Sequence, residues 1–216
     1  MVAAGLWLLG RGAPGFSIPS YAVARGPAEA GSLRVRSGMA GLRVNAFAGA
    51  TQLAVGQFPS FTGPTLELSS TRAHLTLDAR AALPFMPGEW AASLVKGLPW
   101  SLTLHSIAGD LALDLRDLML TRVEVRSLLG DVDLTAPVSG QGTMLLDLRL
   151  GDLTLRLPDG AALRLTVQAG PAADARIDDP RLTPVAPGEW QTAQTAPGAR
   201  PWVVQVQLGA GDLRLV

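Results

Sequence analysis

The chain has 216 residues, of which 48% are hydrophobic and 17% charged, so it is long and apolar enough for one folded domain and is not intrinsically disordered. Its formal net charge is 0, with 18 basic and 18 acidic residues, which argues against nucleic acid as a general partner because phosphate binding needs a concentrated positive surface. There is no cysteine, which excludes disulfides, thiolate catalysis and cysteine-ligated metals.

Residues 1–20 form an apolar N-terminal stub, in which Val2 to Leu9 are apolar and Arg11 follows. A membrane-spanning helix needs about 20 apolar residues, so this run is too short to cross a bilayer. Two interpretations stay open. The stub is either a short terminal segment or the remnant of a membrane segment whose beginning is missing, and Trp7 beside the arginine is typical of a membrane exit.

From residue 33 onward a twelve-residue pattern recurs, with aliphatic residues at positions 1, 3, 10 and 12, a small residue at position 8 and usually Asp at position 9. The six copies begin at Leu33, Leu66, Leu102, Val123, Met144 and Val204. Four copies carry a Gly-Asp pair, and the first three pairs are 21 residues apart. These pairs are Gly109 and Asp110, Gly130 and Asp131, Gly151 and Asp152, and Gly211 and Asp212.

Each copy is interpreted as a strand, a corner and a second strand. Aliphatic and polar residues alternate on both sides of the Gly-Asp pair, which is the period of a strand with one buried face. Glycine accepts a positive φ at a corner without steric cost. The aspartate side chain is expected to accept a hydrogen bond from the backbone N–H two residues further on.

The constant 21-residue spacing predicts an all-β fold, a right-handed, β-helix-like β-solenoid of short stacked strands. We expect a three-sided coil with about 21 residues in each rung and the aliphatic residues at positions 1, 3, 10 and 12 pointing inward. A β-sandwich is the alternative, because it shows the same alternation, but it does not explain corners that return at constant spacing. Residues 21–216 are expected to form a single domain.

A longer repeat overlaps this pattern. Pro87-Gly88-Glu89-Trp90 recurs as Pro187-Gly188-Glu189-Trp190, and each copy is followed by a second tryptophan. The four tryptophans are Trp90, Trp100, Trp190 and Trp202. They are candidate contacts for a partner, or else they fasten long loops onto the solenoid. Residues 168–201 are rich in Pro, Ala and Gly and are predicted to form an extended excursion.

The chain carries no recognisable catalytic constellation. Its two histidines, His74 and His105, have no cysteine or nearby second histidine with which to bind zinc, and no nucleophile-elbow or phosphate-binding motif is present. Asp110, Asp131 and Asp152 are expected to lie in one column, where they either cap their turns with arginines nearby or attract a cation such as Ca²⁺. We expect the first arrangement, with no metal, no cofactor, no small-molecule substrate and no enzymatic activity.

The segments 204–215 and 151–167, in which strands flank Gly-Asp pairs, resemble the toastrack β-solenoid family. That family includes the C-terminal domains of LiaF- and LiaG-type bacterial envelope-stress proteins and adhesin-like proteins. The resemblance extends over roughly residues 33–216. It implies a bacterial interaction or scaffolding module near the membrane, with no catalytic residues.

The leading functional hypothesis is a non-enzymatic module of the cell envelope that binds a membrane-associated protein, with a role in envelope stress signalling. One alternative is a polymerising scaffold similar to bactofilins, which requires uncovered solenoid ends. Another is a lipid-binding amphipathic β-protein, which requires an open apolar groove. The expected location is the cell envelope, associated with the membrane, and the alternative is the cytoplasm.

Overall fold

The computed structural model describes residues 20–58, 64–78, 89–193 and 201–216, and within these ranges it contains strands but no helix. No helix in these ranges is therefore available to cross a membrane. The strands are β1 Ser20–Ala24, β2 Ala30–Ser37, β3 Gly41–Phe47, β4 Gln52–Gln57, β5 Thr65–Ser69, β6 Arg72–Asp78, β7 Glu89–Val95, β8 Pro99–Ala108, β9 Leu111–Asp114, β10 Met119–Leu129, β11 Val132–Thr135, β12 Thr143–Leu150, β13 Leu153–Arg156, β14 Leu163–Ile177, β15 Leu182–Ala186, β16 Glu189–Thr192 and β17 Trp202–Leu215. The proposed N-terminal stub lies outside the described residues except for Ser20, where β1 begins.

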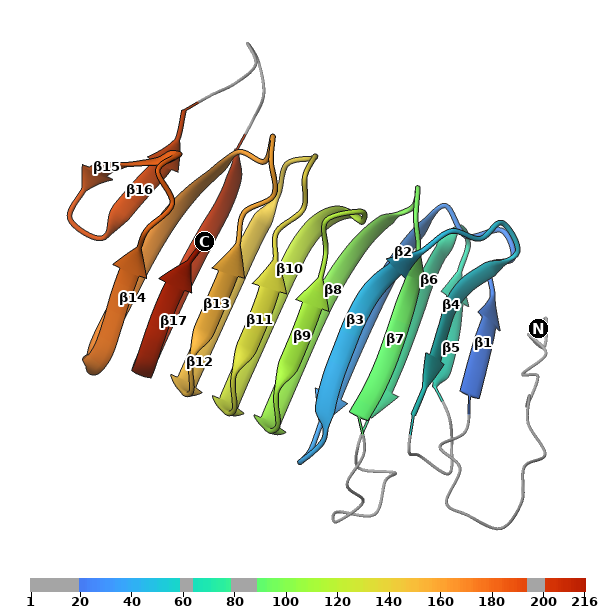
Figure 1. The fold of residues 1–216 in the computed structure, drawn as a ribbon. Helices are drawn as coiled ribbons and strands as arrows, with labels where there is room; N and C mark the ends of the chain where they lie inside the picture. Colours follow the sequence, from blue (N-terminus) through green and yellow to red (C-terminus); the bar gives the residue numbers. More distant parts are fainter. Residues whose placement is uncertain (1–19, 59–63, 79–88, 194–200) are drawn as a thin grey trace.

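The protein is a β-solenoid with two layers (Figure 1). The back layer runs β6–β2–β8–β10–β12–β17–β14, and the front layer runs β7–β3–β9–β11–β13–β17–β14, with parallel pairing throughout. The long strands β14 and β17 bend round the corner and so belong to both layers. The side chains between the layers form one continuous hydrophobic cluster.

The 21-residue repeat is the repeat of the stack. Val123 of β10 pairs with Leu102 of β8 on one side and with Met144 of β12 on the other, each 21 residues away. Each rung contains two strands, so the expected three-sided coil is wrong. The reason is strand length: β10 alone takes 11 residues, and a tight turn closed by the bond from Leu118 N to Leu115 O (3.1 Å) leads into it, which leaves no residues for a third side.

The inward positions of the repeat are buried as expected in five of the six copies. Leu111, Val132 and Leu153, for example, are at most 1% exposed. The copy that begins at Leu66 differs, because β5 and β6 form an antiparallel hairpin and not a solenoid corner. Its Leu66 is half-buried and Leu68 is 39% exposed, so the expectation is wrong for these two positions, whereas Leu75 and Leu77 of the same copy are buried.

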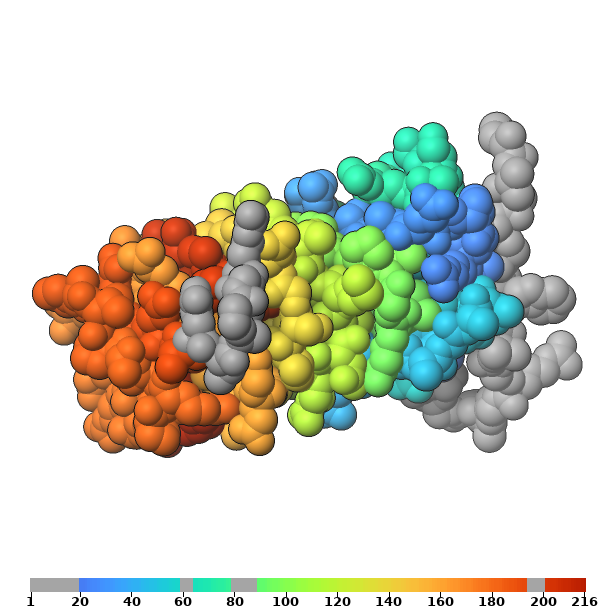
Figure 2. Space-filling model, turned by 90° about the horizontal axis from the view of Figure 1, so that it is seen from above, coloured from blue at the N-terminus to red at the C-terminus, as the bar shows by residue number. Residues whose placement is uncertain are grey.

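The rungs do not follow chain order at either end of the stack. The last strand, β17, lies between β12–β13 and β14, and the rung β2–β3 lies between β6 and β7 on one side and β8–β9 on the other. Figure 2 shows the elongated body that results, with the N-terminal and C-terminal parts at opposite ends. Antiparallel strands are added at both ends, where β4 pairs with β7, β5 with β6 and β16 with β14. Such strands cover edges that otherwise invite further pairing.

The expected excursion at residues 168–201 is only partly correct. Residues up to Ile177 continue β14 and pair with β17 through the whole front layer. Only the following segment leaves the stack, as the antiparallel hairpin of β15 and β16. Two of the alanines that suggested a loop, Ala173 and Ala175, instead pack against the core in the last rung, where Ala175 pairs with Leu213.

Candidate functional site

The four corner glycines form a column through the middle of the stack. Gly109, Gly130, Gly151 and Gly211 have φ values of 109°, 122°, 136° and 119°. A Cβ atom on Gly151 would lie 2.2 Å from the carbonyl oxygen of Gly130, and one on Gly211 would lie equally close to that of Gly151. Glycine is therefore required twice over, by the backbone conformation and by the close approach of the next rung.

The corner aspartates form a ladder between rungs. Asp110 Oδ1 accepts the amide N–H of Asp131 (3.0 Å), Asp131 Oδ1 accepts that of Asp152 (2.9 Å), and Asp152 Oδ1 accepts that of Asp212 (2.8 Å). The expectation that each carboxylate accepts from the amide two residues further on is therefore wrong, because stacking brings an amide of the next rung within hydrogen-bond distance of the carboxylate. The carboxylates join one rung to the next instead of closing their own turns.

The aspartate column is acidic and largely uncompensated. Within the described ranges, Asp110, Asp131 and Asp152 form no ion pair, so the nearby arginines that we expected do not neutralise them, and only Asp212 has an arginine within 4.0 Å, its near neighbour Arg214. No group of three or more potential metal-binding side chains was found among these residues. The column is therefore an exposed line of negative charge.

The tryptophans do not form a surface patch. Trp90, Trp100 and Trp202 are 2%, 0% and 3% exposed, so their assignment as partner contacts is wrong. Each occupies an inward-facing position in the alternation of its own strand. In the core, Trp100 N–H donates to the Val95 carbonyl (3.0 Å), and the ring of Trp90 contacts the ring of Phe58 edge-on. Trp190 is half-buried opposite Leu165, where the hairpin joins the stack.

A row of exposed aliphatic side chains follows the corner edge, and sequence reasoning missed it. This corner ridge consists of Met39, Ile107, Leu128, Leu129 and Leu150, which are 67%, 59%, 48%, 43% and 49% exposed. The residues lie on four consecutive rungs, and Leu129 is paired directly with Leu150. The signal was present in the sequence, because these residues occupy positions 6 and 7 of the repeat, outside the inward alternation.

The ridge has different charges on its two sides. The glycine and aspartate columns follow it immediately in the chain, so uncompensated carboxylates lie along one side. Arg126, on the other side, is paired with Glu124 (2.9 Å), and Arg149, which occupies position 6 of the repeat in line with Leu128, is paired with Asp147 (3.5 Å). The ridge is thus an apolar strip with a net acidic border.

The histidines lie on the outer face of the back layer. His74 Nδ1 lies 2.7 Å from Ser32 Oγ, in a groove of about 680 Å³ that is lined by both polar and apolar surface. Glu67 is paired in register with His74 but forms no ion pair with it, so the serine and histidine have no carboxylate partner among the described residues. Burial and the nearby Arg126 lower the pKa of His105, which favours its neutral form.

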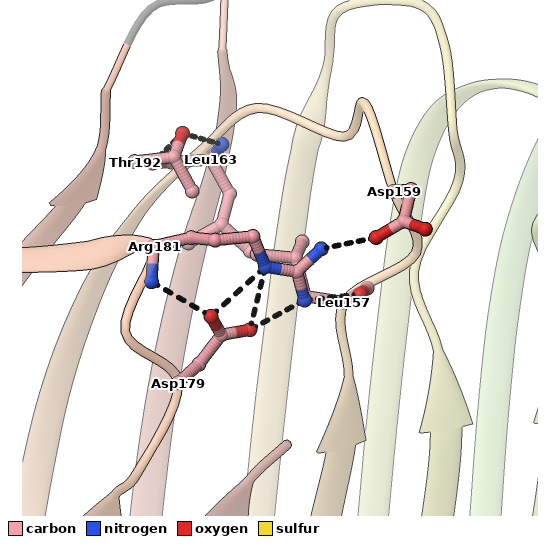
Figure 3. A network of polar contacts seen from close by, with 6 residues as sticks. All are labelled: Leu157, Asp159, Leu163, Asp179, Arg181 and Thr192. Atoms are coloured by element: carbon pink, nitrogen blue, oxygen red, sulfur yellow. Dashed lines mark hydrogen bonds and ion pairs between the residues drawn. The ribbon is translucent and has the colours of Figure 1, made fainter.

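An ion pair between the buried Asp179 carboxylate and the partly exposed Arg181 fastens the terminal hairpin to the stack (Figure 3). Arg181 Nε donates to both oxygens of Asp179, and its Nη atoms reach the Leu157 carbonyl and Asp159. Asp179 is only 6% exposed, and its hydrogen bonds from Arg181 lower the pKa of its carboxyl. In the same region Leu163 N–H donates to Thr192 Oγ1 (3.0 Å).

The comparisons with known proteins agree with this architecture. A crystal structure of a candidate cell adhesion protein from Clostridium sporogenes superposes with a TM-score of 0.77 at 17% identity, over 91% of this chain and 96% of the other. At that identity the likeness shows the fold alone. No curated protein matches the chain. The family model for the N-terminal domain of toast_rack (DUF2154) matches residues 22–156, more than half of the sequence, and the chain therefore belongs to the toast-rack family.

Proposed function

We propose that this protein is a non-enzymatic interaction module of the bacterial cell envelope, which binds a membrane-associated protein through the corner ridge. The single observation that carries the proposal is the row of five exposed aliphatic side chains on four consecutive rungs. Isolated exposed aliphatics are ordinary, but a contiguous apolar strip on a folded surface is typical of an interaction site.

The charges around the ridge indicate the chemistry of the partner. An apolar strip bordered by unneutralised carboxylates fits a partner surface that has an apolar groove with lysine or arginine at its rim. The fixed 21-residue repeat holds the ridge side chains on a rigid frame, which lowers the entropy lost on binding. We therefore expect an interface with an apolar centre and an electrostatic contribution from the aspartate column.

The cellular setting of the proposal is supported by the family and by the sequence. The similar crystal structure is that of a candidate cell adhesion protein, and the apolar run at Val2 to Leu9 followed by Arg11 is compatible with a membrane-proximal start. We include in the proposal that the protein acts in envelope stress signalling. The lipid-binding alternative needs an open apolar groove, whereas the described apolar core lies between the two layers and is partly exposed only at the β14 edge.

The test is recovery of the partner from native membranes. The full-length protein is immunoprecipitated from detergent-solubilised membranes of its own organism, as wild type and as a Leu128→Asp, Leu129→Asp double variant. The matched control is Val138→Asp, which alters an exposed apolar side chain (40%) in the turn between β11 and β12, away from the corner edge. A third variant, Asp131→Asn, removes a charge from the border while keeping a hydrogen-bond acceptor.

The proposal expects the double variant to lose a co-precipitating membrane protein by about tenfold or more and the Val138 variant to retain it. Asp131→Asn should weaken recovery moderately, and the remaining complex should depend less on salt. If the double variant unfolds at the wild-type temperature and still recovers every partner at the wild-type level, the ridge is not the binding surface.

A further inference from the structure

The front layer ends in an uncovered strand edge. The second half of β14, from Ala172 to Ile177, pairs with β17 on one side, and no described strand pairs with its other side. The hairpin strand β16 reaches β14 only at Arg164–Thr166, in the back layer. In Figure 1 this half of β14, which ends in the arrowhead, is the outermost strand of the front layer.

The core is only partly covered at this edge. Ala173, Ala175 and Ile177 pack against the core, the last two in register with inward-facing residues of β17, yet all three stay half-exposed. Their counterparts Leu213 and Leu215, one rung further in, are fully buried. One more strand at this position would remove the remaining apolar surface from water.

The open edge is held by a side chain. The amide N–H of Ala175 donates to the carboxylate of its neighbour Asp174 (2.9 Å), and Arg176 Nε lies 3.2 Å from the other oxygen of the same carboxylate. In the interior rungs the corner carboxylate accepts an amide from the next rung. Asp174 has no next rung and binds its own neighbour, so the backbone groups of the edge stay available to a strand that displaces it.

The edge sequence is complementary to itself. When two copies of Ala172–Ile177 are placed antiparallel with Ala175 opposite Ala175, Asp174 of each copy faces Arg176 of the other on the solvent side. On the core side, Ala173 of each copy faces Ile177 of the other. Opposite charges and a small residue beside a large one are favourable cross-strand pairs, and the arrangement has the two-fold symmetry of most homodimers.

We propose that two copies of this protein associate through this edge, with the front layers continuing across an antiparallel β14–β14 pairing. The inference is independent of the proposed function, because the corner ridge and the β14 edge involve different residues. Two-fold pairing covers the β14 edge of each of the two copies, so the product is a closed dimer and not a filament.

The decisive experiment uses charge reversal and recombination. Asp174→Arg places arginines at both positions, and Arg176→Asp places aspartates at both, so each variant should repel its own kind. Both positions are exposed, so both variants should fold. Sedimentation equilibrium of the full chain over a concentration series should show a dimer for the wild type. The dissociation constant of each single variant should be about tenfold higher than that of the wild type.

Mixing the two single variants should restore dimers, because every 174–176 pair then joins opposite charges. The double variant Asp174→Arg, Arg176→Asp should dimerise alone for the same reason. A wild-type monomer at all concentrations overturns the proposal. So does a dimer that both single variants leave unchanged, because that dimer uses another surface.

A second measurement checks the register. The chain has no native cysteine, so Ala175→Cys introduces a single thiol that faces its own copy across the two-fold axis. Mild oxidation should give a disulfide-linked dimer. Ala112→Cys, in the interior strand β9, is the matched control and should form no disulfide-linked dimer under the same conditions. Equal crosslinking of the two variants would contradict the proposed register.

Discussion

At the scale of single residues, the central rungs of the stack depend on a corner formed by Gly-Asp. The glycine lets neighbouring rungs approach until a Cβ atom has no room, and the aspartate then reaches across to the amide of the next rung. The two residues therefore act together. The glycine creates the short distance between rungs, and the carboxylate uses that distance for a hydrogen bond.

Replacing Gly151 with alanine tests the corner. The new Cβ would meet the Gly130 carbonyl oxygen at 2.2 Å, and φ is 136°, so the two penalties together should lower the free energy of unfolding by about 3 kcal/mol or more. Gly160→Ala is the control: its φ is also positive (81°), but nothing lies within 4 Å of the new Cβ. It should cost about 1 kcal/mol. Urea unfolding measures both, and equal losses would show that contact between rungs is not what requires glycine.

The aspartate ladder makes a separate prediction. Asp131→Ala removes the acceptor of the Asp152 amide, so it should destabilise the fold by about 1 kcal/mol. Asp131→Asn keeps an acceptor oxygen and removes one negative charge from the column, so it should remain within about 0.5 kcal/mol of the wild type. The same urea titrations measure both variants. If asparagine proved as harmful as alanine, the charge of Asp131, and not its acceptor, would be the stabilising feature.

At the scale of elements, the terminal hairpin is held by an ion pair with a buried carboxylate as well as by backbone pairing. Arg181 connects Asp179, beside the hairpin, with the Leu157 carbonyl at the end of the rung β12–β13. Removing Arg181 would leave the buried Asp179 carboxylate without compensation, which is costly. The ion pair therefore links the hairpin of β15 and β16 to a rung that is not its neighbour in sequence.

The Asp179 carboxyl should make the hairpin sensitive to acid. Its pKa is lowered in the folded protein by hydrogen bonds from Arg181, so its stabilising contribution is complete above its unfolded pKa, near pH 4, and is lost as the pH falls through the lower folded value. The protection factors of the amides in β15 and β16, which correct the exchange rate for its intrinsic pH dependence, should fall in that acidic range. In Asp179→Asn these protection factors should be lower at neutral pH, and their pH dependence should flatten. An unchanged pH profile in the variant would contradict this role.

At the scale of the whole molecule, the strand–corner–strand unit of a rung could be predicted from the sequence, but the order of the rungs in the stack could not. Inward alternation and the 21-residue spacing predicted the stack, because both are local patterns. The insertion of β17 between β13 and β14 was not predictable, because the aliphatic strands of different rungs are chemically interchangeable. Trp100 was misplaced although it lies two residues before Leu102, in the inward alternation. The corner ridge was missed because its residues lie at positions 6 and 7 of the repeat, outside the inward alternation from which the stack was predicted.

The central claim is that the corner ridge is the binding surface of a non-enzymatic module, and site-specific photo-crosslinking in living cells tests it most directly. A photoreactive residue is placed in turn at Leu128 on the ridge, at Thr154 on the front layer and at Val138 in the turn between β11 and β12. The account predicts a crosslinked membrane-associated protein from Leu128 that is lost when Leu129→Asp is added, and none from the other two positions. The same product from all three positions, or from Thr154 alone, would contradict it.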